Sequence, residues 1–242
     1  AGAGAGAGSD LLERVMARES VTVRHGRDDR TVEDRAGGAM ARAHEGTVTG
    51  VAVDGLNRVV ASAGLDGKLK LWDLHSMALL ETLDMGAPLS ALELHRDSGL
   101  VAVVGDDLVV RCVDLESRRI VRRFSGHANR ITDLAFSADA RWLVTASADC
   151  TLRVWDVPAA KCIDWARFPQ PVTSLAWSPT GEFLATSHVG SVAIYLWANK
   201  ARFSDVFLDT EPAAPTPLSM PTPVRATGDD GTVGRGVEEE EE

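Results

Sequence analysis

Four similar segments recur along this chain at nearly equal intervals, and this repeat constrains the fold more than any other feature. The segments begin at Val48, Leu89, Ile131 and Val172, so successive starts lie 41, 42 and 41 residues apart. Short stretches rich in Val, Leu and Ile alternate with turns rich in Gly, Asp and Ser. This pattern predicts many short β-strands and no large helical part. A fixed period of about 40 residues indicates a repeat architecture.

The second half of each unit supports the same register. The position 24 residues after each start is occupied in turn by Trp72, Val113, Trp155 and Leu196. The first three of these are followed by Asp. Units of 40 to 45 residues that end in Trp-Asp are typical of β-propeller blades, each of which is a sheet of four antiparallel strands. The predicted fold is therefore all-β, with four blades over residues 41–208.

We expect the recurring segments to form the first strand of each blade, and the other strands to follow in order. The second strands are expected at 58–62, 100–104, 142–147 and 183–187. The third strands are expected at 68–72, 108–113, 151–155 and 192–197. The fourth strands are expected at 78–83, 120–124, 161–168 and 202–208.

The two ends of the chain differ from the repeats in composition. Residues 1–40 begin with an Ala-Gly repeat and continue as a polar, weakly patterned stretch, so we expect a mostly disordered head. Residues 209–242 contain five prolines within twelve residues and end in a run of Glu. Proline lacks the N–H that a strand ladder uses, and like charges repel one another. We therefore expect a disordered tail without ladder pairing.

Charge and cysteine content exclude few functions but narrow the class of protein. The net charge is −10, and residues 209–242 alone carry 9 acidic and 2 basic side chains, so the repeats can still contact RNA. Cys112, Cys150 and Cys162 lack C-x-x-C spacing and are interpreted as packed thiols, without a disulfide framework or zinc site. No secretory signal and no apolar run long enough for a bilayer is found. We expect no cofactor, no membrane association and no small-molecule substrate.

The repeats resemble the WD40 family, and the third unit carries the resemblance best. It contains Gly126-His127, then Ser147 and Asp149, then Trp155-Asp156. In that family a Trp indole, a hydroxyl, a His and a turn Asp form a buried chain of hydrogen bonds that fixes one packing. The resemblance implies that His127, Ser147, Asp149 and Trp155 form this relay.

The other units match the relay positions less completely. The first unit has His44, Asp66 and Trp72 at the same intervals, but Gly64 stands at the expected hydroxyl position, so an incomplete relay is expected. The second and fourth units are expected to be degenerate. The second keeps Asp107 alone, with Met85 and Val113 at the His and Trp positions; the fourth has Phe168, Gly190 and Leu196, with Trp197 shifted by one residue.

The His127–Asp149 pair has a second interpretation, as a catalytic dyad with Ser147 as the nucleophile. A His that is oriented by a carboxylate is how many general bases are built. However, the same His–Asp interval recurs in the first unit, whereas a catalytic site occurs once, and no oxyanion or metal feature accompanies it. We therefore favour the packing role and predict that the protein is not an enzyme.

Basic residues provide the candidate partner contacts. Arg118, Arg119, Arg122 and Arg123 lie on the expected fourth strand of the second unit, where they either contact RNA phosphates or discourage edge pairing. Arg130 lies in the loop that enters the third unit, on the rim where propellers usually bind partners. It is a further contact candidate.

Several stretches are more specific than WD40 patterning requires. They include Leu94–Gly99, Arg119–His127 and Ser178–Val189. They resemble the final blades of a family of nucleolar WD-repeat proteins in the UTP-B subcomplex of the small-subunit processome. The resemblance implies a scaffold in pre-18S ribosomal RNA processing, located in the nucleolus of the nucleus. Its implied partners are other UTP-B proteins, with pre-ribosomal RNA and small nucleolar RNA as further candidates. The alternative is a generic WD40 adaptor, such as the substrate receptor of a ubiquitin ligase.

Four blades do not normally close a ring. The chain is therefore expected to be a partial propeller, either an open arc or a fragment of a larger one. An open arc leaves two raw strand edges and an exposed apolar flank. We expect the isolated chain to aggregate or to bind a partner along these edges.

Overall fold

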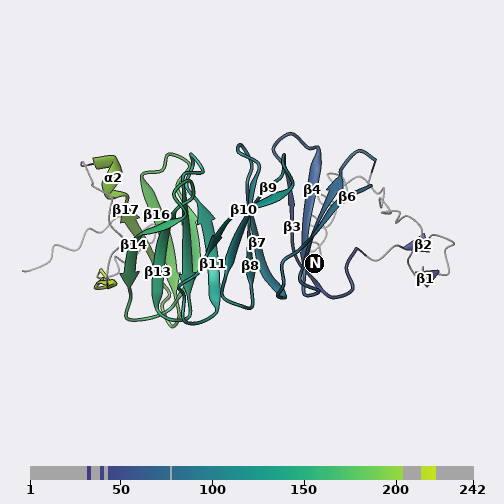
Figure 1. Ribbon diagram of the computed structural model, residues 1–242. Helices are drawn as coiled ribbons and strands as arrows, with labels where there is room; N and C mark the ends of the chain where they lie inside the picture. The colour runs from purple at the N-terminus through teal and green to yellow at the C-terminus, as the bar shows by residue number, and fades with distance from the viewer. Residues whose placement is uncertain (1–31, 34–38, 41–42, 77, 204–213, 222–242) are drawn as a thin grey trace, which may run out of the picture.

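The computed structural model describes residues 32–33, 39–40, 43–76, 78–203 and 214–221. Figure 1 shows these residues as β-sheets that stand side by side in chain order, from blue to green. Each main sheet is built from consecutive antiparallel strands, so all of its ladder contacts are local in sequence. The all-β prediction is therefore confirmed.

The first two sheets contain four strands each, and the strand bounds follow the predicted register. The first sheet comprises β3 (Val48–Val53), β4 (Val59–Gly64), β5 (Lys68–Asp73) and β6 (Leu79–Asp84). The second comprises β7 (Leu89–His95), β8 (Leu100–Gly105), β9 (Val110–Asp114) and β10 (Arg119–Phe124).

The third sheet has an additional strand, and the fourth sheet has three. The third comprises β11 (Ile131–Phe136), β12 (Trp142–Ser147), β13 (Thr151–Asp156), β14 (Lys161–Arg167) and β18 (Thr216–Pro217). The fourth comprises β15 (Val172–Trp177), β16 (Phe183–His188) and β17 (Ile194–Ala198). A separate pair is formed by β1 (Val32–Glu33) and β2 (Ala39–Met40), and α2 spans Lys200–Phe203. Within the described ranges, no helix is long and apolar enough to span a bilayer.

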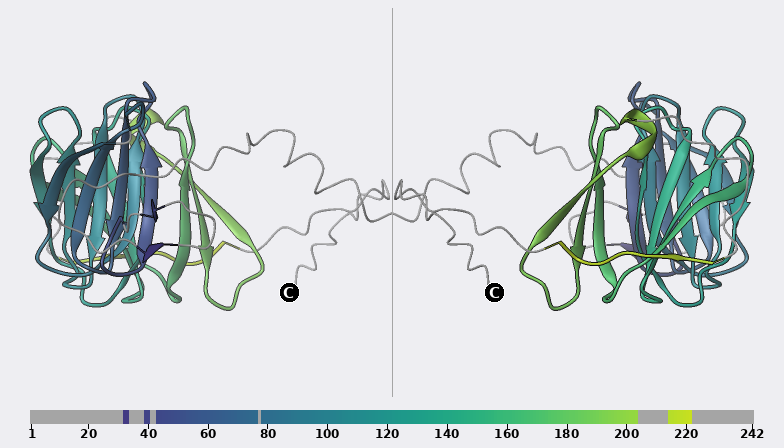
Figure 2. Two further views of the ribbon diagram at one scale, coloured as in Figure 1. Left: turned by 90° about the vertical axis from the view of Figure 1, so that its right-hand side faces the viewer. Right: turned by 90° about the vertical axis from the view of Figure 1, so that its left-hand side faces the viewer.

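The first strand of each sheet packs against the first strand of the next, so β3, β7, β11 and β15 form the inner row. Figure 2 shows the stack from its two ends. Among the described residues the stack does not close into a ring. The structure therefore confirms a partial propeller of the WD40 type.

The hydrophobic core consists of three clusters, each between two adjacent sheets. Leu69 and Leu71 of the first sheet meet Leu89 of the second; Val110 and Cys112 of the second meet Leu134 of the third; Leu152 of the third meets Val172 of the fourth. The second and third sheets thus each contribute one face to the cluster before them and the other face to the cluster after them. Among the described residues, one face of the first sheet and one face of the fourth have no neighbouring sheet.

Two strand-level predictions are wrong. The fourth strand expected at 202–208 is not formed at its start, because residues 200–203 are helical; positions 204–208 lie outside the described residues. The tail was expected to make no ladder, yet β18 pairs in parallel with Ala166 and Arg167 of β14. Pro217 is tolerated because β18 is an edge strand, where a missing N–H costs no ladder bond. The backbone N–H of Leu218 then donates to the Arg167 carbonyl at 2.9 Å.

The expectations of a disordered head and tail concern mostly residues outside the described ranges. Within the head, the β1–β2 pair joins Val32 to Met40 and Glu33 to Ala39. The domain boundaries at 40 and 208 remain predictions.

Candidate functional site

The relay of the third sheet is assembled by strand register. In the β12–β13 ladder Leu143 lies opposite Trp155, so Thr145 lies diagonally across on the same face. The Trp155 indole N–H donates to Thr145 Oγ1 at 2.8 Å, and His127 Nε2 lies 2.8 Å from the same oxygen. His127 Nδ1 lies 3.2 Å from Asp149 Oδ2. Because the Asp149 carboxylate can only accept, His127 carries its proton on Nδ1 and Thr145 donates to Nε2.

The prediction that Ser147 supplies the relay hydroxyl is wrong. Ser147 Oγ donates to the Asn129 carbonyl at 2.8 Å and accepts from the Asp149 backbone N–H at 3.1 Å. Ser147 lies at the end of β12, opposite Ile131 of β11. It is two residues beyond Thr145, the residue that lies diagonally across from Trp155. His127, Asp149 and Trp155 are confirmed as relay members, and Thr145 is the hydroxyl that joins them.

The relay of the first sheet is complete, which corrects the prediction for that unit. His44 Nε2 and the Trp72 indole N–H both contact Ser62 Oγ, at 2.8 and 2.9 Å. His44 Nδ1 lies 2.9 Å from Asp66 Oδ1. Gly64 does not replace the hydroxyl but makes room for the relay. A Cβ there would lie 2.6 Å from both His44 Nδ1 and Asp66 Oδ1.

The fourth sheet contains a variant relay that sequence reasoning missed. The Trp197 indole N–H donates to Thr186 Oγ1 at 2.9 Å, and His188 Nε2 lies 3.0 Å from that oxygen. The histidine therefore comes from the strand itself, two residues after the threonine. Phe168 occupies the usual histidine position and packs edge-on against His188 at 4.9 Å and Trp197 at 5.3 Å. The available signal was the Thr-x-His spacing, which places both side chains on one face of β16.

The second sheet replaces the relay with an ion pair. The Arg111 guanidinium, which is buried, contacts the Asp107 carboxylate through two nitrogens, one of them at 3.1 Å. The hydrogen bond from Arg111 outweighs desolvation and lowers the pKa of Asp107 below its ordinary value. Met85 fills the histidine position and is buried, as expected for a degenerate unit. Asp and Arg four residues apart around a tight turn were the missed signal.

The electrostatics of the two full relays favour packing over catalysis. Burial alone would raise the pKa of Asp149, but hydrogen bonds from His127, Thr151 and the Ala128 backbone hold it well below its ordinary value. The pKa of Asp66 is lowered in the same manner, against desolvation, chiefly by His44. The side chains of His44 and His127 are 0% and 1% exposed. A histidine that is buried and bonded at both nitrogens cannot reach a substrate proton, so the dyad interpretation loses its geometric basis.

The basic residues do not form one cluster. Arg122 points toward the third sheet, where its Nε and one terminal nitrogen donate to the Val157 and Pro158 carbonyls at 2.8 and 2.9 Å. The Arg122 side chain thus links the second sheet to the third. Whether it also contacts a partner stays a prediction.

The other four candidates are exposed but divided between two ends of one strand. Arg118 immediately precedes β10 and Arg119 is its first residue. Arg123 lies near the end of β10, and Arg130 follows in the next loop. Five residues of β-strand cover roughly 16 Å. A single phosphate cannot contact both pairs. The role of these residues as partner contacts stays a prediction.

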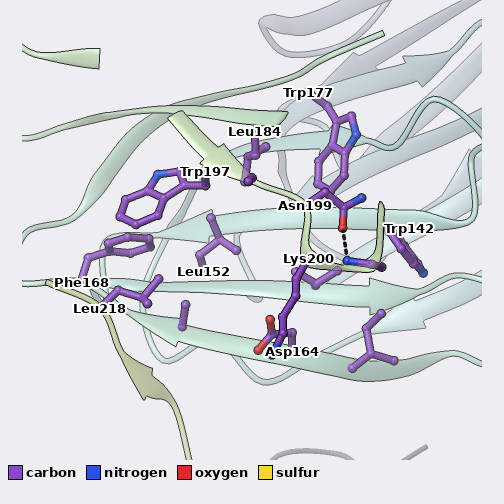
Figure 3. Close-up of a pocket in the computed structure, with 15 residues that line it drawn as sticks. Trp142, Leu152, Asp164, Phe168, Trp177, Leu184, Trp197, Asn199, Lys200 and Leu218 are labelled. Carbon is purple, nitrogen blue, oxygen red and sulfur yellow. Dashed lines mark hydrogen bonds between the residues drawn. The ribbon is translucent and has the colours of Figure 1, made fainter. Parts of the chain in front are cut away.

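An apolar hollow of about 330 Å³ lies between the third and fourth sheets. Figure 3 shows the aromatic rings of Phe168, Trp177 and Trp197 around it, with Leu218 of the tail on one side. Asp164 and Lys200 are the charged side chains that line it. The fourth sheet has no outer strand among the described residues at this place, which explains the hollow. In that same part of the chain, no group of three or more potential metal ligands comes together.

Comparison with known proteins identifies the family. Residues 31–223 match the family model described as the WDR36/Utp21 second beta-propeller domain. The chain is 42% identical over 182 residues to WD repeat-containing protein 36 of Homo sapiens, covering 75% of this chain and 20% of that protein. It is 46% identical over 159 residues to the U3 small nucleolar RNA-associated protein 21 homolog of Schizosaccharomyces pombe, covering 66% and 18%.

A third relative gives the same result. The chain is 42% identical over 163 residues to U3 small nucleolar RNA-associated protein 21 of Saccharomyces cerevisiae, covering 67% of this chain and 17% of that protein. The chain thus spans about a fifth of the length of these relatives. The solved structure of the computationally designed Ika4 protein matches with a TM-score of 0.57 and 23% identity, covering 64% of this chain and 93% of that one. At this identity the structural match supports the fold alone.

Proposed function

The chain belongs to the family of WDR36/Utp21 second beta-propeller domains, and from this membership we propose that it is a non-catalytic scaffold in small-subunit ribosome biogenesis. Two of the relatives described above carry association with U3 small nucleolar RNA in their names. The proposed partners are other UTP-B proteins of the processome, together with U3 small nucleolar RNA and pre-ribosomal RNA. The proposed location is the nucleolus, and the proposed role is in pre-18S ribosomal RNA processing.

One structural observation supports the scaffold role independently of family membership. The His–hydroxyl–Trp relay is built in the first and third sheets and in altered form in the fourth, and its histidines are buried. A polar device that is repeated in several sheets serves the packing of those sheets. The propeller then offers loops and strand edges to partners, and its own residues have no reaction to perform.

Affinity purification of the full chain tests this function. A tagged chain is expressed in nucleolus-containing cells, and the U3 small nucleolar RNA and the proteins that co-purify are measured. We expect U3 to be enriched over an abundant spliceosomal RNA, and depletion of the endogenous protein to cause pre-18S precursors to accumulate. Recovery of ubiquitin-ligase subunits without U3 would instead support the adaptor alternative.

Direct contact with RNA is a separate part of the proposal. It would be made by exposed arginines. Replacing Arg119, Arg123 and Arg130 with Gln removes three positive charges from the candidate surface. Neutralising phosphate contacts is expected to weaken RNA binding at low salt and to flatten its salt dependence. The matched control replaces Arg96, Lys161 and Arg167, which are exposed elsewhere. Equal RNA binding by both variants would assign the scaffold role to protein contacts alone.

A further inference from the structure

Arg153, in the middle of β13, has a buried guanidinium without an acceptor. The ladders place Arg153 opposite Thr145 of β12 on one side and opposite Trp165 of β14 on the other. The residue is 9% exposed. Among the described residues, no group accepts a hydrogen bond from the Arg153 guanidinium, and none forms an ion pair with it. A buried charge without a partner destabilises a fold, so this arginine needs an explanation.

The equivalent arginine of the second sheet does have a partner. Arg111 lies 42 residues before Arg153, at the same place in the repeat, and it pairs with Asp107. The counterpart of Asp107 in the third sheet is Asp149. Both carboxylate oxygens of Asp149 are already engaged, by His127 and by neighbouring groups of the turn. The relay of the third sheet therefore uses the acceptor that Arg153 lacks.

Two tryptophans and a glycine surround the Arg153 guanidinium. Its Cζ lies 4.0 Å from the centroid of the Trp165 ring and 5.8 Å from that of Trp155. The backbone of Gly126 passes so close that a Cβ there would lie 2.8 Å from Arg153 Nη1. Stacking on the rings offsets part of the cost of burying the charge, but it gives the N–H groups no hydrogen-bond acceptor. We call Gly126, Arg153 and Trp165 the arginine slot.

The arginine slot contains a second donor without an acceptor. The Trp165 indole nitrogen and Arg153 Nε are both buried, and neither has a hydrogen-bond partner in the part of the chain that the structure describes. The terminal nitrogens of Arg153 are not fully buried, so a group from outside can reach them. The slot lies between the second and third sheets, each of which has a neighbouring sheet on either side. Its positive charge and its free donors are complementary to an anion.

The shape of the arginine slot favours a carboxylate over an RNA phosphate. A guanidinium presents its N–H groups as a planar fork that matches the two oxygens of a carboxylate. Because Arg153 is 9% exposed, the anion must enter the slot on a slender side chain. A Glu or Asp side chain does so. A phosphodiester carries a ribose on either side and suits arginines that project from the surface.

We propose that Arg153 binds an acidic side chain, Glu or Asp, of a protein partner in the arginine slot. The carboxylate accepts from both terminal nitrogens of Arg153, as the Asp107 carboxylate does from those of Arg111. This inference goes beyond the proposed function, which places RNA on exposed arginines. It rests on the geometry of the slot and does not depend on whether the chain binds U3.

Binding of an acidic peptide tests the proposal. The probe is a fluorescein-labelled hexaglutamate peptide, and its binding to the full chain is followed by fluorescence anisotropy. Glu238–Glu242 are changed to Gln in every protein tested, so that the chain's own glutamates do not compete with the probe. We expect a dissociation constant below about 1 mM, and Arg153→Gln should raise it at least about 10-fold. Lys161→Gln removes an exposed charge from the same sheet and, as the matched control, should leave it unchanged.

Two further variants separate binding from folding. Arg153→Lys keeps the charge but loses the planar fork, so peptide binding should weaken about 3-fold or more. Arg153→Met removes an unpaired buried charge and keeps the apolar contact with Trp165. The midpoint of its urea denaturation should therefore stay the same or rise, while peptide binding is lost.

Three results would overturn the proposal. Absence of peptide binding by the parent chain, or an equal loss with Lys161→Gln, would mean that the arginine slot takes no carboxylate. A lower urea midpoint for Arg153→Met would mean that the guanidinium serves packing on the tryptophans. If Arg153→Gln weakened the binding of a hexauridylate RNA as much as that of the peptide, the slot would be assigned to phosphate.

Discussion

At the scale of single residues, one hydroxyl decides whether each relay is complete. Thr145 Oγ1 accepts from the Trp155 indole and donates to His127, so it satisfies two buried groups at once. Without it, a buried indole N–H and a buried imidazole nitrogen lose their partner together. The relay therefore depends on this side chain more than on the serine two residues later.

Replacing Thr145 with Val tests this assignment directly. The shape is nearly kept, but two buried polar groups become unsatisfied, so we expect a loss of about 2–4 kcal/mol in the free energy of unfolding. Ser147→Ala should cost about 1 kcal/mol, because its partner carbonyl on exposed Asn129 can turn to water. Urea denaturation followed by tryptophan fluorescence measures both. A larger loss for Ser147→Ala would contradict the assignment.

The low pKa of Asp149 makes stability depend on pH in the acid range. Because its folded-state pKa lies below the ordinary value of 3.8, the folded state binds fewer protons than the unfolded state between the two values. Its contribution is therefore fully present above about pH 5 and is lost as the pH falls through the folded pKa. Asp149→Asn should lower stability at pH 7 and reduce the loss between pH 5 and pH 2, measured by urea denaturation at each pH. Asp97→Asn, in an exposed turn, is the control; an equal effect of both would argue against the relay as the source.

The sequence interval predicts some relay members and misses others for a physical reason. His44, Asp66 and Trp72 recur as His127, Asp149 and Trp155 because each stands at a fixed place in a repeated loop or strand. The hydroxyl was missed because Trp155 contacts the residue diagonally across the β12–β13 ladder. The register of that ladder cannot be read from the spacing of residues in the sequence. His188 was missed because it fills its role from a different strand position.

At the scale of elements, Gly50 is a point of close approach between the first and second sheets. A Cβ on Gly50 would lie 2.7 Å from the Cβ of Leu92, which is attached directly to the β7 backbone and cannot rotate away. The inner strands β3 and β7 can approach this closely because one of them lacks a side chain there. The corresponding positions of the other sheets hold Ala91, Asp133 and Ser174, so Gly50 is the one glycine at this position of the four repeats.

Gly50→Ala should therefore force β3 and β7 apart. Overpacking of this kind costs about 1–3 kcal/mol. We expect a lower urea midpoint and faster hydrogen exchange in β3 and β7, with exchange in β12 and β13 unchanged. Wild-type stability in this variant would mean that the two strands do not pack at the distance described.

Strand positions followed from the repeat wherever the period and the local sequence agreed. Every expected strand from 48 to 198 is found within two residues of its predicted ends. The failure at 202–208 arose because the period was extended against a local signal. Asn199 Oδ1 accepts from the Ala201 backbone N–H at 3.1 Å, which is a helix N-cap contact. The pairing of β18 with β14 joins residues about 50 apart, and no repeat position indicates it.

At the scale of the whole molecule, the stack behaves as a row of units that contact only their neighbours. In such arrays stability is nearly a sum of unit and interface contributions, so a unit with one neighbour opens more readily than a unit with two. Within the part of the chain that the structure describes, the second and third sheets each pack on two neighbours, whereas the first and fourth each pack on one. The ends of the row should therefore exchange their amide hydrogens before the centre does.

Hydrogen exchange of the wild-type chain should follow this order. Amides of β8, β9, β12 and β13 should be protected longest, while those of β4, β5, β16 and β17 exchange sooner. Equal protection of the end sheets and the central sheets would argue against a row of units that open separately.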